Sequence, residues 1–388
     1  MFASSIRIKY AFYHHISKNF DDPWLRLHFK AEGNLEYTGL LYVPSEQPYD
    51  LFQLDKKQGL KLYVNKVFIS DKVEELLPNY LRFVKGVIDS ADLPLNISRE
   101  MLQNSPLMER IKNGTVSRLL KELKKKTKDY DDYIEFWKNF GIVLKEGIYE
   151  DIKNREDIAA ISYFYSTNDA DKLTSFDEYI SRCDKGQKAI YYITGDDVAV
   201  LRNNPQLEAF KQKGIEVLLM NDPIDEFWPQ VLPNYKGYAI KHVSQADVDM
   251  TWKREEKKAD EGSLNKLCDF MADVLKNEVG KVVPTEKLAA SAVSLTVEGG
   301  QMSLHLERLM RNHQQQTAFA STRILELNPY HELIIKLSDM VMDDANKPTI
   351  EEITKILFDQ SKVAEGEPVS DPSFYASAVA NYILKSLN

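Results

Sequence analysis

Cysteine is nearly missing from this chain of 388 residues, which has only Cys183 and Cys268. The two are far apart and belong to no paired motif, so the sequence predicts free thiols and a reducing compartment. Long hydrophobic runs are missing too, because no stretch of about 18 apolar residues occurs. The first ten residues also lack the apolar region of a signal peptide. These absences argue against a membrane protein and predict a cytoplasmic one.

Positive charge does not dominate the sequence. Lys and Arg number 50 against 59 Asp and Glu, which gives a formal net charge of -9. A protein that mainly binds nucleic acid normally needs a dominant basic surface, so we expect no nucleic-acid partner. One basic run, Lys121 to Lys128, leaves a nucleic-acid module open as an alternative, although charge runs on helices are usually solvated faces.

Motifs for nucleotides, metals and hydrolysis are missing as well. The sequence has no GxGxxG or GxxxxGK[ST] loop, and its only adjacent glycines are Gly299 and Gly300, so we expect no self-contained phosphate site. The histidines form no HExxH, and no Cys or carboxylate completes a set around His305 and His313, so we expect no metal site. No GxSxG elbow occurs either. The sequence therefore offers no complete active site.

What the sequence does contain is apolar surface for more than one core, since hydrophobic residues make up 43% of it. This length predicts two or three domains. Residues 35–43 and 60–69 are rich in β-branched and aromatic residues and are expected to be strands. Residues 74–87 and 106–140 have apolar residues at helical spacing and are expected to be buried helices.

Strands and helices alternate further along the chain. Residues 188–194 and 215–220 are apolar runs separated by a helical stretch, 205–213, that Gly214 ends, which predicts a parallel strand pair. The charged run 247–262 is weakly patterned and is expected to be a linker. Beyond it, helices are expected over 263–276, 303–312, 349–361 and 372–387, and strands over 292–297 and 323–327.

These elements predict a mixed fold, α/β in the wider sense or α+β. We expect a large α/β part and the start of a helical region over residues 1–140. A helical connector and a small α/β part are expected over 141–246. The linker 247–262 then leads to a C-terminal α/β domain over 263–388.

Residues 87–103, VIDSADLPLNISREMLQ, are the most informative segment. The letters DLP indicate a turn, and Asn96 or Ser98 is a natural N-cap for a helix that begins near Arg99. The helix dipole disfavours a cation in the first turn, so Arg99 needs an anionic partner. A neighbouring carboxylate is one such partner. Phosphate oxygens are another, because they suit the planar guanidinium.

The run DLPLNISREMLQ resembles the catalytic loop of the ninety-kilodalton heat-shock chaperones. The other runs that match in family order are LLYVPSEQPYDLF, KLYVNKVFISD, LPNYLRFVKGVIDS, IYYITG, KGIEVLLMNDPIDEF and RILELNPYHELI. The resemblance extends from about His15 to the end, and the absence of the eukaryotic acidic tail motif is typical of the bacterial branch. It implies a middle segment of αβα layers and a C-terminal dimerisation domain, without the N-terminal ATPase domain.

In this family the loop of the middle segment contacts the γ-phosphate of ATP held by the ATPase domain. The resemblance implies that Arg99 supplies this contact from another domain, that Gln103 supports it, and that Asn96 lies in the same loop. It places Phe68 where the middle segment meets the ATPase domain. ATP with Mg²⁺ is the implied cofactor of the complete protein; we expect none on this chain alone, and no hydrolysis by it.

The resemblance also implies unfolded or partly folded client proteins as partners. The residues that match the family's client-binding positions are Phe20, Trp24, Glu226, Phe227, Trp228, Met302, Leu306, Leu309 and Met310. At two of these, Phe20 and Phe227, the relatives tend to have Trp. The last four lie on one helical face by their spacing alone, and flexible Met suits varied partners. Packing of that face on its own domain is the alternative.

The two closing helices are apolar on two sides, so a monomer would cover them poorly. The resemblance implies that they pair with a second copy as a two-fold four-helix bundle. The interface residues expected are Ile353, Leu357, Tyr375, Val379, Ile383 and Leu387. The chain is thus predicted to be the client-binding, dimerising component of an ATP-dependent chaperone. A self-contained ATPase and a non-catalytic interaction module stay open as alternatives.

Overall fold

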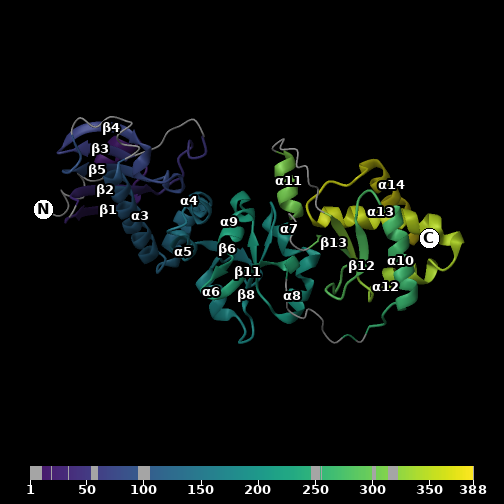
Figure 1. Ribbon diagram of the computed structural model, residues 1–388. Coiled ribbons are helices and arrows are strands. Elements are labelled where there is room, and N and C mark those ends of the chain that lie inside the picture. The colour runs from purple at the N-terminus through teal and green to yellow at the C-terminus, as the bar shows by residue number, and fades with distance from the viewer. Residues whose placement is uncertain are drawn as a thin grey trace. The chain divides into compact units, whose positions relative to one another are not determined.

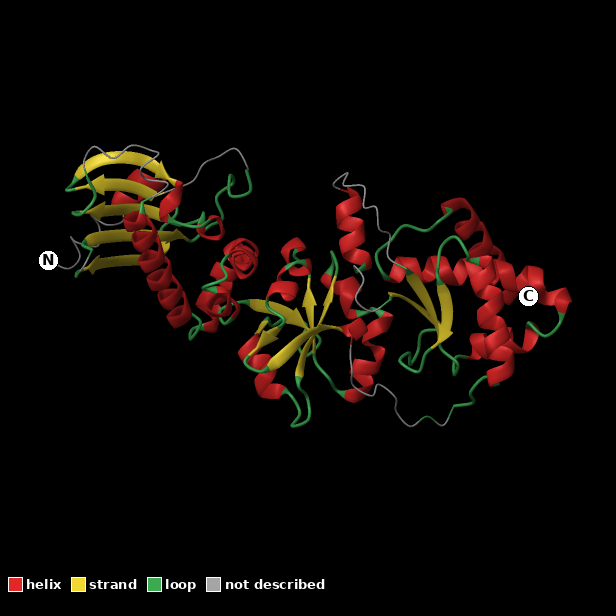
Figure 2. Ribbon diagram, viewed as in Figure 1, coloured by secondary structure: helices red, strands yellow, loops and turns green. Residues whose placement is uncertain are grey.

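The computed structural model describes residues 11–18, 20–33, 35–53, 60–94, 105–245, 254, 256–298, 303–312 and 322–387. The chain divides into two compact units, Met1–Tyr163 and Phe164–Asn388 (Figure 1). Both units mix helices and strands (Figure 2), which confirms the predicted fold class. The linker expected over 247–262 falls inside the second unit, and eight of its residues, 247–253 and 255, lie outside the described part.

The first unit is built on a five-stranded sheet with the order β1-β2-β5-β3-β4. Its strands are β1 (Pro23–Ala31), β2 (Tyr37–Pro44), β3 (Leu60–Val64), β4 (Val67–Val73) and β5 (Lys85–Ser90). Strand β2 matches the expected strand over 35–43. The single strand expected over 60–69 is wrong, because β3 and β4 form an antiparallel hairpin there. Its two turn residues, Asn65 and Lys66, have φ of 50° and 66°, as a tight hairpin turn requires.

The helix expected over residues 74–87 is also wrong. Two single turns, η1 (Glu74–Leu76) and η2 (Asn79–Leu81), are followed directly by β5. Pro78 lies between the two turns and cannot continue a helix. The apolar side chains are nevertheless buried, among them Leu76, Tyr80 and Phe83. Their spacing therefore predicted correctly that these side chains are buried, but it predicted the wrong secondary structure.

The helical stretch expected over 106–140 is two long helices, α3 (Pro106–Lys126) and α4 (Tyr130–Glu150), followed by α5 (Arg155–Ala159). Asp129 separates them by capping α4, since its side chain accepts the backbone N–H of Asp132. Four aromatic residues of α4 are core residues: Tyr133, Phe136, Trp137 and Phe140. The ring of Phe136 stacks on Trp24 at 4.5 Å between centroids, and Phe140 stacks on Phe83 at 4.7 Å.

The second unit begins with a six-stranded sheet of order β10-β11-β8-β9-β6-β7. The strands are β6 (Tyr163–Ser166), β7 (Thr174–Ser175), β8 (Ala189–Thr194), β9 (Val217–Met220), β10 (Asn234–Tyr235) and β11 (Tyr238–His242). Strands β8 and β9 are parallel, as expected. Between them lie α7 (Val198–Arg202), η3 (Pro205–Leu207) and α8 (Glu208–Lys213), and Gly214 ends α8 with φ of 67°.

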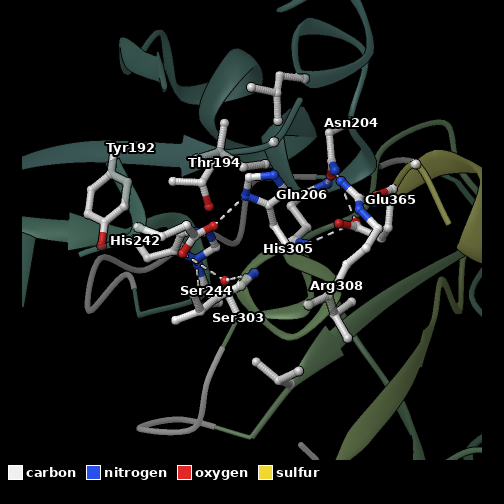
Figure 3. Close-up of a pocket in the computed structure, with 18 of the residues that line it drawn as sticks. Tyr192, Thr194, Asn204, Gln206, His242, Ser244, Ser303, His305, Arg308 and Glu365 are labelled. Atoms are coloured by element: carbon white, nitrogen blue, oxygen red, sulfur yellow. Dashed lines mark hydrogen bonds and ion pairs between the residues drawn. The ribbon is translucent and has the colours of Figure 1, made fainter. Parts of the chain in front are cut away.

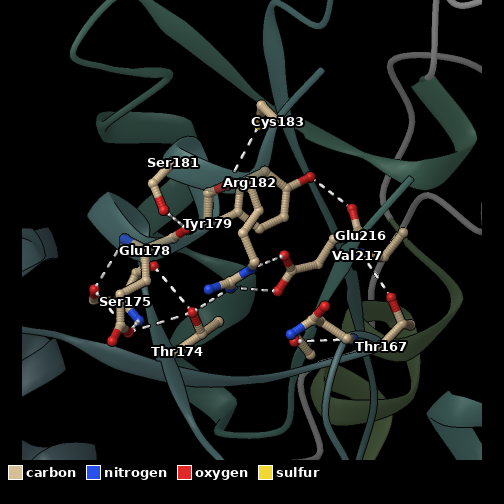
Figure 4. A network of polar contacts seen from close by, with 12 residues as sticks. Thr167, Thr174, Ser175, Glu178, Tyr179, Ser181, Arg182, Cys183, Glu216 and Val217 are labelled. Atoms are coloured by element: carbon tan, nitrogen blue, oxygen red, sulfur yellow. Dashed lines mark hydrogen bonds and ion pairs between the residues drawn. The ribbon is translucent and has the colours of Figure 1, made fainter. Parts of the chain in front are cut away.

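A polar network fixes α6 (Phe176–Arg182) to this sheet (Figure 4). Ser175 and Glu178 form a capping box at its start. At its end the guanidinium of Arg182 donates to both carboxylate oxygens of Glu216, at 2.8 and 2.9 Å. Burial raises the pKa of the neighbouring Cys183 thiol to about 11, so this cysteine stays protonated and is a poor nucleophile.

The rest of the second unit has a three-stranded sheet of order β12-β14-β13. Its strands are β12 (Lys281–Pro284), β13 (Val293–Val297) and β14 (Arg323–Leu327), and its helices are α10 (Glu261–Val274), α11 (Leu304–Asn312), α12 (Glu332–Met340), α13 (Lys347–Ala364) and α14 (Pro372–Ser386). All but β12 and α12 match the expected elements. This C-terminal part has its own apolar core, which is separate from the core of the six-stranded sheet. Among the described helices, none is long and apolar enough to cross a membrane.

Candidate functional site

The three predicted catalytic residues, Asn96, Arg99 and Gln103, lie outside the described residues. The segment that carries them follows β5, the central strand of the first sheet, and precedes α3. Phe68, the predicted contact with the ATPase domain, lies on the edge strand β4 with 52% of its surface exposed. An exposed aromatic residue on a sheet edge is available to another domain.

The two predicted client-binding residues of the first unit differ in exposure. Phe20 is fully exposed. Trp24 is half-buried: its ring stacks on Phe136, and its Nε1 donates to Asp132 at 2.9 Å. Trp24 thus belongs mainly to the packing of β1 against α4, while Phe20 is open to a partner.

The predicted client residues Glu226, Phe227 and Trp228 lie on η4 (Pro223–Glu226) and at the start of α9 (Trp228–Val231). Phe227 is half-buried, and Glu226 is buried. Trp228 has no exposed surface, and its Nε1 donates to Asp225 at 2.8 Å. In this structure Trp228 is core, so a client could contact it only after a rearrangement.

The amphipathic helix α11 presents its expected apolar stripe only in part. Leu306 is buried, whereas Leu309 and Met310 are half-buried. Met302 lies outside the described residues. The accessible part of the stripe is therefore its C-terminal end, while the buried Leu306 fits the alternative in which the stripe packs on its own domain.

The expected dimer residues fall into two groups. Ile353 and Leu357 of α13 pack in the core of their own domain. Tyr375 and Val379 of α14 are half-buried, while Ile383 and Leu387 are 56% and 78% exposed, with Leu384 beside them at 60%. Ala378 is the one described residue of α14 that is buried. The protomer itself therefore leaves most of α14 uncovered.

A pocket of about 350 Å³ lies within the second unit, between the six-stranded sheet and the C-terminal part that contains the three-stranded sheet (Figure 3). Its wall on the side of the six-stranded sheet includes Thr194, which ends β8, and His242, which ends β11. Its opposite wall includes Ser303, His305 and Arg308, which belong to α11 or directly precede it. Polar and charged side chains thus line a seam between two separately packed cores.

The centre of this seam is a group of five side chains that we call the His305 cluster: Asp196, Glu226, Ser303, His305 and Arg308. The imidazole of His305 is buried, with Nδ1 2.6 Å from a carboxylate oxygen of Glu226 and Nε2 2.8 Å from one of Asp196. Ser303 donates to the second oxygen of Glu226 at 2.8 Å. Arg308 donates to the second oxygen of Asp196 at 2.6 Å.

These contacts set the charge state of the His305 cluster. Burial alone would lower the pKa of His305, but the hydrogen bonds and charges of Glu226 and Asp196 outweigh it and raise the pKa. Burial likewise opposes ionisation of Glu226 and Asp196, yet the bonds from His305, together with Ser303 and Arg308, lower both pKa values. The imidazolium between two carboxylates is the favoured state.

A second acid lines the pocket and is half-buried. Glu365, just after α13, accepts from the side-chain amides of Asn204 at 3.0 Å and Gln206 at 3.1 Å. Burial, more than the nearby charge of Glu367, raises the pKa of Glu365 to about 7. Arg308 donates to the backbone oxygen of Glu365 at 2.9 Å, which links this acid to the His305 cluster.

A third carboxylate joins α8 to the loop before β13. Glu208 accepts the backbone N–H groups of Ala290 at 2.9 Å and Ser291 at 3.1 Å, that of Ala289 at 2.5 Å, and the hydroxyl of Ser291 at 2.6 Å. Successive N–H groups of this kind form an anion-binding nest. Here a side chain of the same chain occupies it.

The polar side chains that line the pocket attach the two parts of the second unit to each other. The carboxylates of the pocket already bind cations, amides or N–H groups of this chain, and in the described part of the chain no group of three His, Cys, Asp or Glu could hold a metal ion. Sequence reasoning missed the His305 cluster because its members are distant along the chain. His305 lies 79 residues from Glu226 and 109 from Asp196, so no local spacing signals the pairing.

Comparison with known proteins adds a family to this description. A family model described as Hsp90 protein matches residues 9–388. Among curated relatives, the chaperone protein HtpG of Paramagnetospirillum magneticum is 47% identical over 385 residues, and that of Rhodospirillum rubrum is 43% identical over 388. These alignments cover 97% of this chain and 62% and 61% of the relatives. The chain thus spans about three-fifths of their length.

Proposed function

Because the chain belongs to the Hsp90 family, we propose that it binds unfolded or partly folded client proteins in the bacterial cytoplasm and acts as a homodimer. The match over residues 9–388 carries this proposal. The structure adds apolar side chains that its own packing leaves accessible: Phe20, Leu309 and Met310 for clients, and α14 for a second copy.

Client binding is tested with the intact chain and a fluorescently labelled, reduced and permanently unfolded α-lactalbumin as the probe. Met310→Lys places a charge on the accessible end of the α11 stripe and is expected to weaken binding about 10-fold, because a buried unpaired charge costs on the order of 1–3 kcal/mol. Met310→Leu keeps the apolar surface and should bind as the parent chain does. Equal affinity for all three proteins, measured by fluorescence anisotropy, would remove α11 from the client site.

Dimerisation through α14 predicts a large effect of charge on its exposed face. The double substitution Ile383→Glu with Leu384→Glu is expected to weaken the dimer about 100-fold, since two carboxylates would enter an apolar interface at roughly 1–3 kcal/mol each. Gln212→Glu, at an exposed position of α8, adds charge outside the two closing helices and serves as the control. Sedimentation equilibrium measures both. A parent chain that stays monomeric at all concentrations would contradict the proposal.

The proposed role of Arg99 is to contact the γ-phosphate of ATP bound to an ATPase domain of the family, with Gln103 and Asn96 in support. With this chain joined to such a domain, Arg99→Ala is expected to lower kcat by about 10²-fold or more, because one preorganised charge on a transition state contributes that much. Arg99→Lys keeps the charge but loses the planar fork and should fall between. Steady-state ATP hydrolysis by this chain alone, abolished by Arg99→Ala, would instead support a self-contained ATPase.

A further inference from the structure

Helix α11 is attached to other elements by polar side chains as well as by its buried leucines. The segments on either side of it, 299–302 and 313–321, lie outside the described residues, so its visible attachments are those of its own side chains. Leu304 and Leu306 bury apolar surface in the seam. His305 and Arg308 point from the helix into the pocket (Figure 3) and bond to Asp196, Glu226 and the backbone of Glu365.

The bonds of the His305 cluster fix the rotation of α11 as well as its position. His305 and Arg308 are three residues apart and share one face of the helix. Ser303 accepts the N–H of Leu306 at 3.0 Å and donates to Glu226, so the first turn is capped by a residue that is itself anchored. With that face bonded to the six-stranded sheet, Met310 lies on the opposite side of the helix, and Leu309, one turn after His305, lies beside the bonded face; both keep partial exposure.

Glu226 cannot serve a client directly in this arrangement. Its carboxylate is buried, and both oxygens are occupied, one by His305 and the other by Ser303. A client side chain that bonded to Glu226 would have to displace its charged partner, His305, and leave a buried charge unpaired.

We propose that Glu226 and Asp196 are positioning residues of the client site, which hold His305 between them and so keep α11 turned with Leu309 and Met310 toward clients. The inference rests on the proposed client-binding function, which it deepens. It assigns His305, which matches no expected client position, a role equal to that of Glu226.

The attachment of α11 through the His305 cluster is expected to depend on pH, because its ionisable groups have shifted pKa values. The carboxylates have lowered pKa values, so their contribution is present above their ordinary values of 4.5 for Glu226 and 3.8 for Asp196 and is lost as pH falls through the lowered pKa values. His305 has a raised pKa, so its contribution is complete below 6.5 and is lost as pH rises through the raised value. The guanidinium of Arg308 faces Asp196 from α11. His242 faces Glu226 from β11, and burial lowers its pKa, so it remains neutral across the upper part of this range.

The test measures the attachment of α11 and client affinity separately, on the intact chain. His305→Gln and Glu226→Gln keep the side chains polar and of similar size but remove the ion pair. Each is expected to speed hydrogen–deuterium exchange of the α11 amides at least 10-fold at pH 6 and to weaken binding of unfolded α-lactalbumin several-fold. The double variant should be no worse than either single one, because both remove the same interaction. In the parent chain, exchange corrected for its intrinsic pH dependence should rise above pH 6.5, and in His305→Gln this rise should be absent.

Two comparisons make the result specific. Glu351→Gln neutralises an exposed carboxylate on α13 that pairs with Lys355 and should change neither measurement. Met310→Lys should weaken client binding without faster exchange of α11. The inference is overturned if the Gln variants exchange faster but bind clients normally, or if Glu226→Gln weakens binding with α11 exchange unchanged. A parent chain that binds no unfolded protein would instead contradict the proposed function, and the inference with it.

Discussion

Replacing Trp228 with alanine is expected to lower the free energy of unfolding of the second unit by about 3–5 kcal/mol, as for other buried Trp residues. Trp228 has no exposed surface and packs against Phe164 and Phe176, each at 5.9 Å between ring centroids. Alanine would leave a cavity at the centre of this aromatic group. It would also remove the hydrogen bond that Nε1 donates to the buried Asp225 carboxylate, which adds to the cost.

The adjacent Phe227 provides the matched control, because it is half-buried and its loss should cost far less than that of Trp228. Urea unfolding followed by far-ultraviolet circular dichroism gives both free energies. The comparison also separates two roles for this aromatic pair. If Trp228 served clients from an exposed position, Trp228→Ala would reduce client binding with little loss of stability, contrary to the buried position described above.

Replacing Arg323 with methionine is the second change with a large expected effect, again about 3–5 kcal/mol of destabilisation. Arg323 lies on β14, and its guanidinium donates to both carboxylate oxygens of Glu367, at 2.8 and 3.1 Å. A carboxylate oxygen of Glu307 lies 3.8 Å away. Both carboxylates are buried. Methionine replaces the aliphatic part of the side chain but leaves these acids short of a cation, and such a loss is costly in a site removed from water.

Lys281→Met is the control for Arg323→Met. Lys281 is on the neighbouring strand β12 and pairs with Glu298 at 3.2 Å, but both side chains are about half exposed. Exposed pairs contribute on the order of 0–1 kcal/mol, so this variant should unfold almost as the parent chain does. Similar urea midpoints for the two variants would show that the buried position of the Arg323 pair adds nothing.

Sequence periodicity predicted this fold well where local and tertiary preferences agree. The parallel pair β8 and β9 followed from two apolar runs around a helix that ends at Gly214, and both long helices of the first unit followed from apolar spacing. It failed over residues 74–87, because buried residues in irregular turns repeat at intervals that resemble a helix. Pro78 was the signal against a helix there. The hairpin turn at Asn65 and Lys66 was missed because neither residue is glycine.

The candidate site was less predictable than the fold. Motif resemblance identified Arg99, Gln103 and Asn96, which lie outside the described residues, and it identified Glu226 without its partner. His305 was considered only as a metal ligand in the sequence, since a lone histidine gives no indication of which carboxylates meet it. The sequence also does not indicate which aromatic residue is buried. Phe227 and Trp228 are adjacent, and only the packing of α9 on the six-stranded sheet makes Trp228 a core residue.

The polar seam between the six-stranded sheet and the C-terminal part determines what would be exposed if these two parts moved apart. Its main joints are carboxylates, Glu208, Glu226 and Glu365, each bound to N–H groups, amides or a cation on the opposite side, while the two apolar cores remain separate. Water can replace hydrogen bonds of this kind one for one, whereas it cannot replace apolar contacts. Opening along such a seam would therefore expose polar groups for the most part and would leave most of the two apolar cores covered.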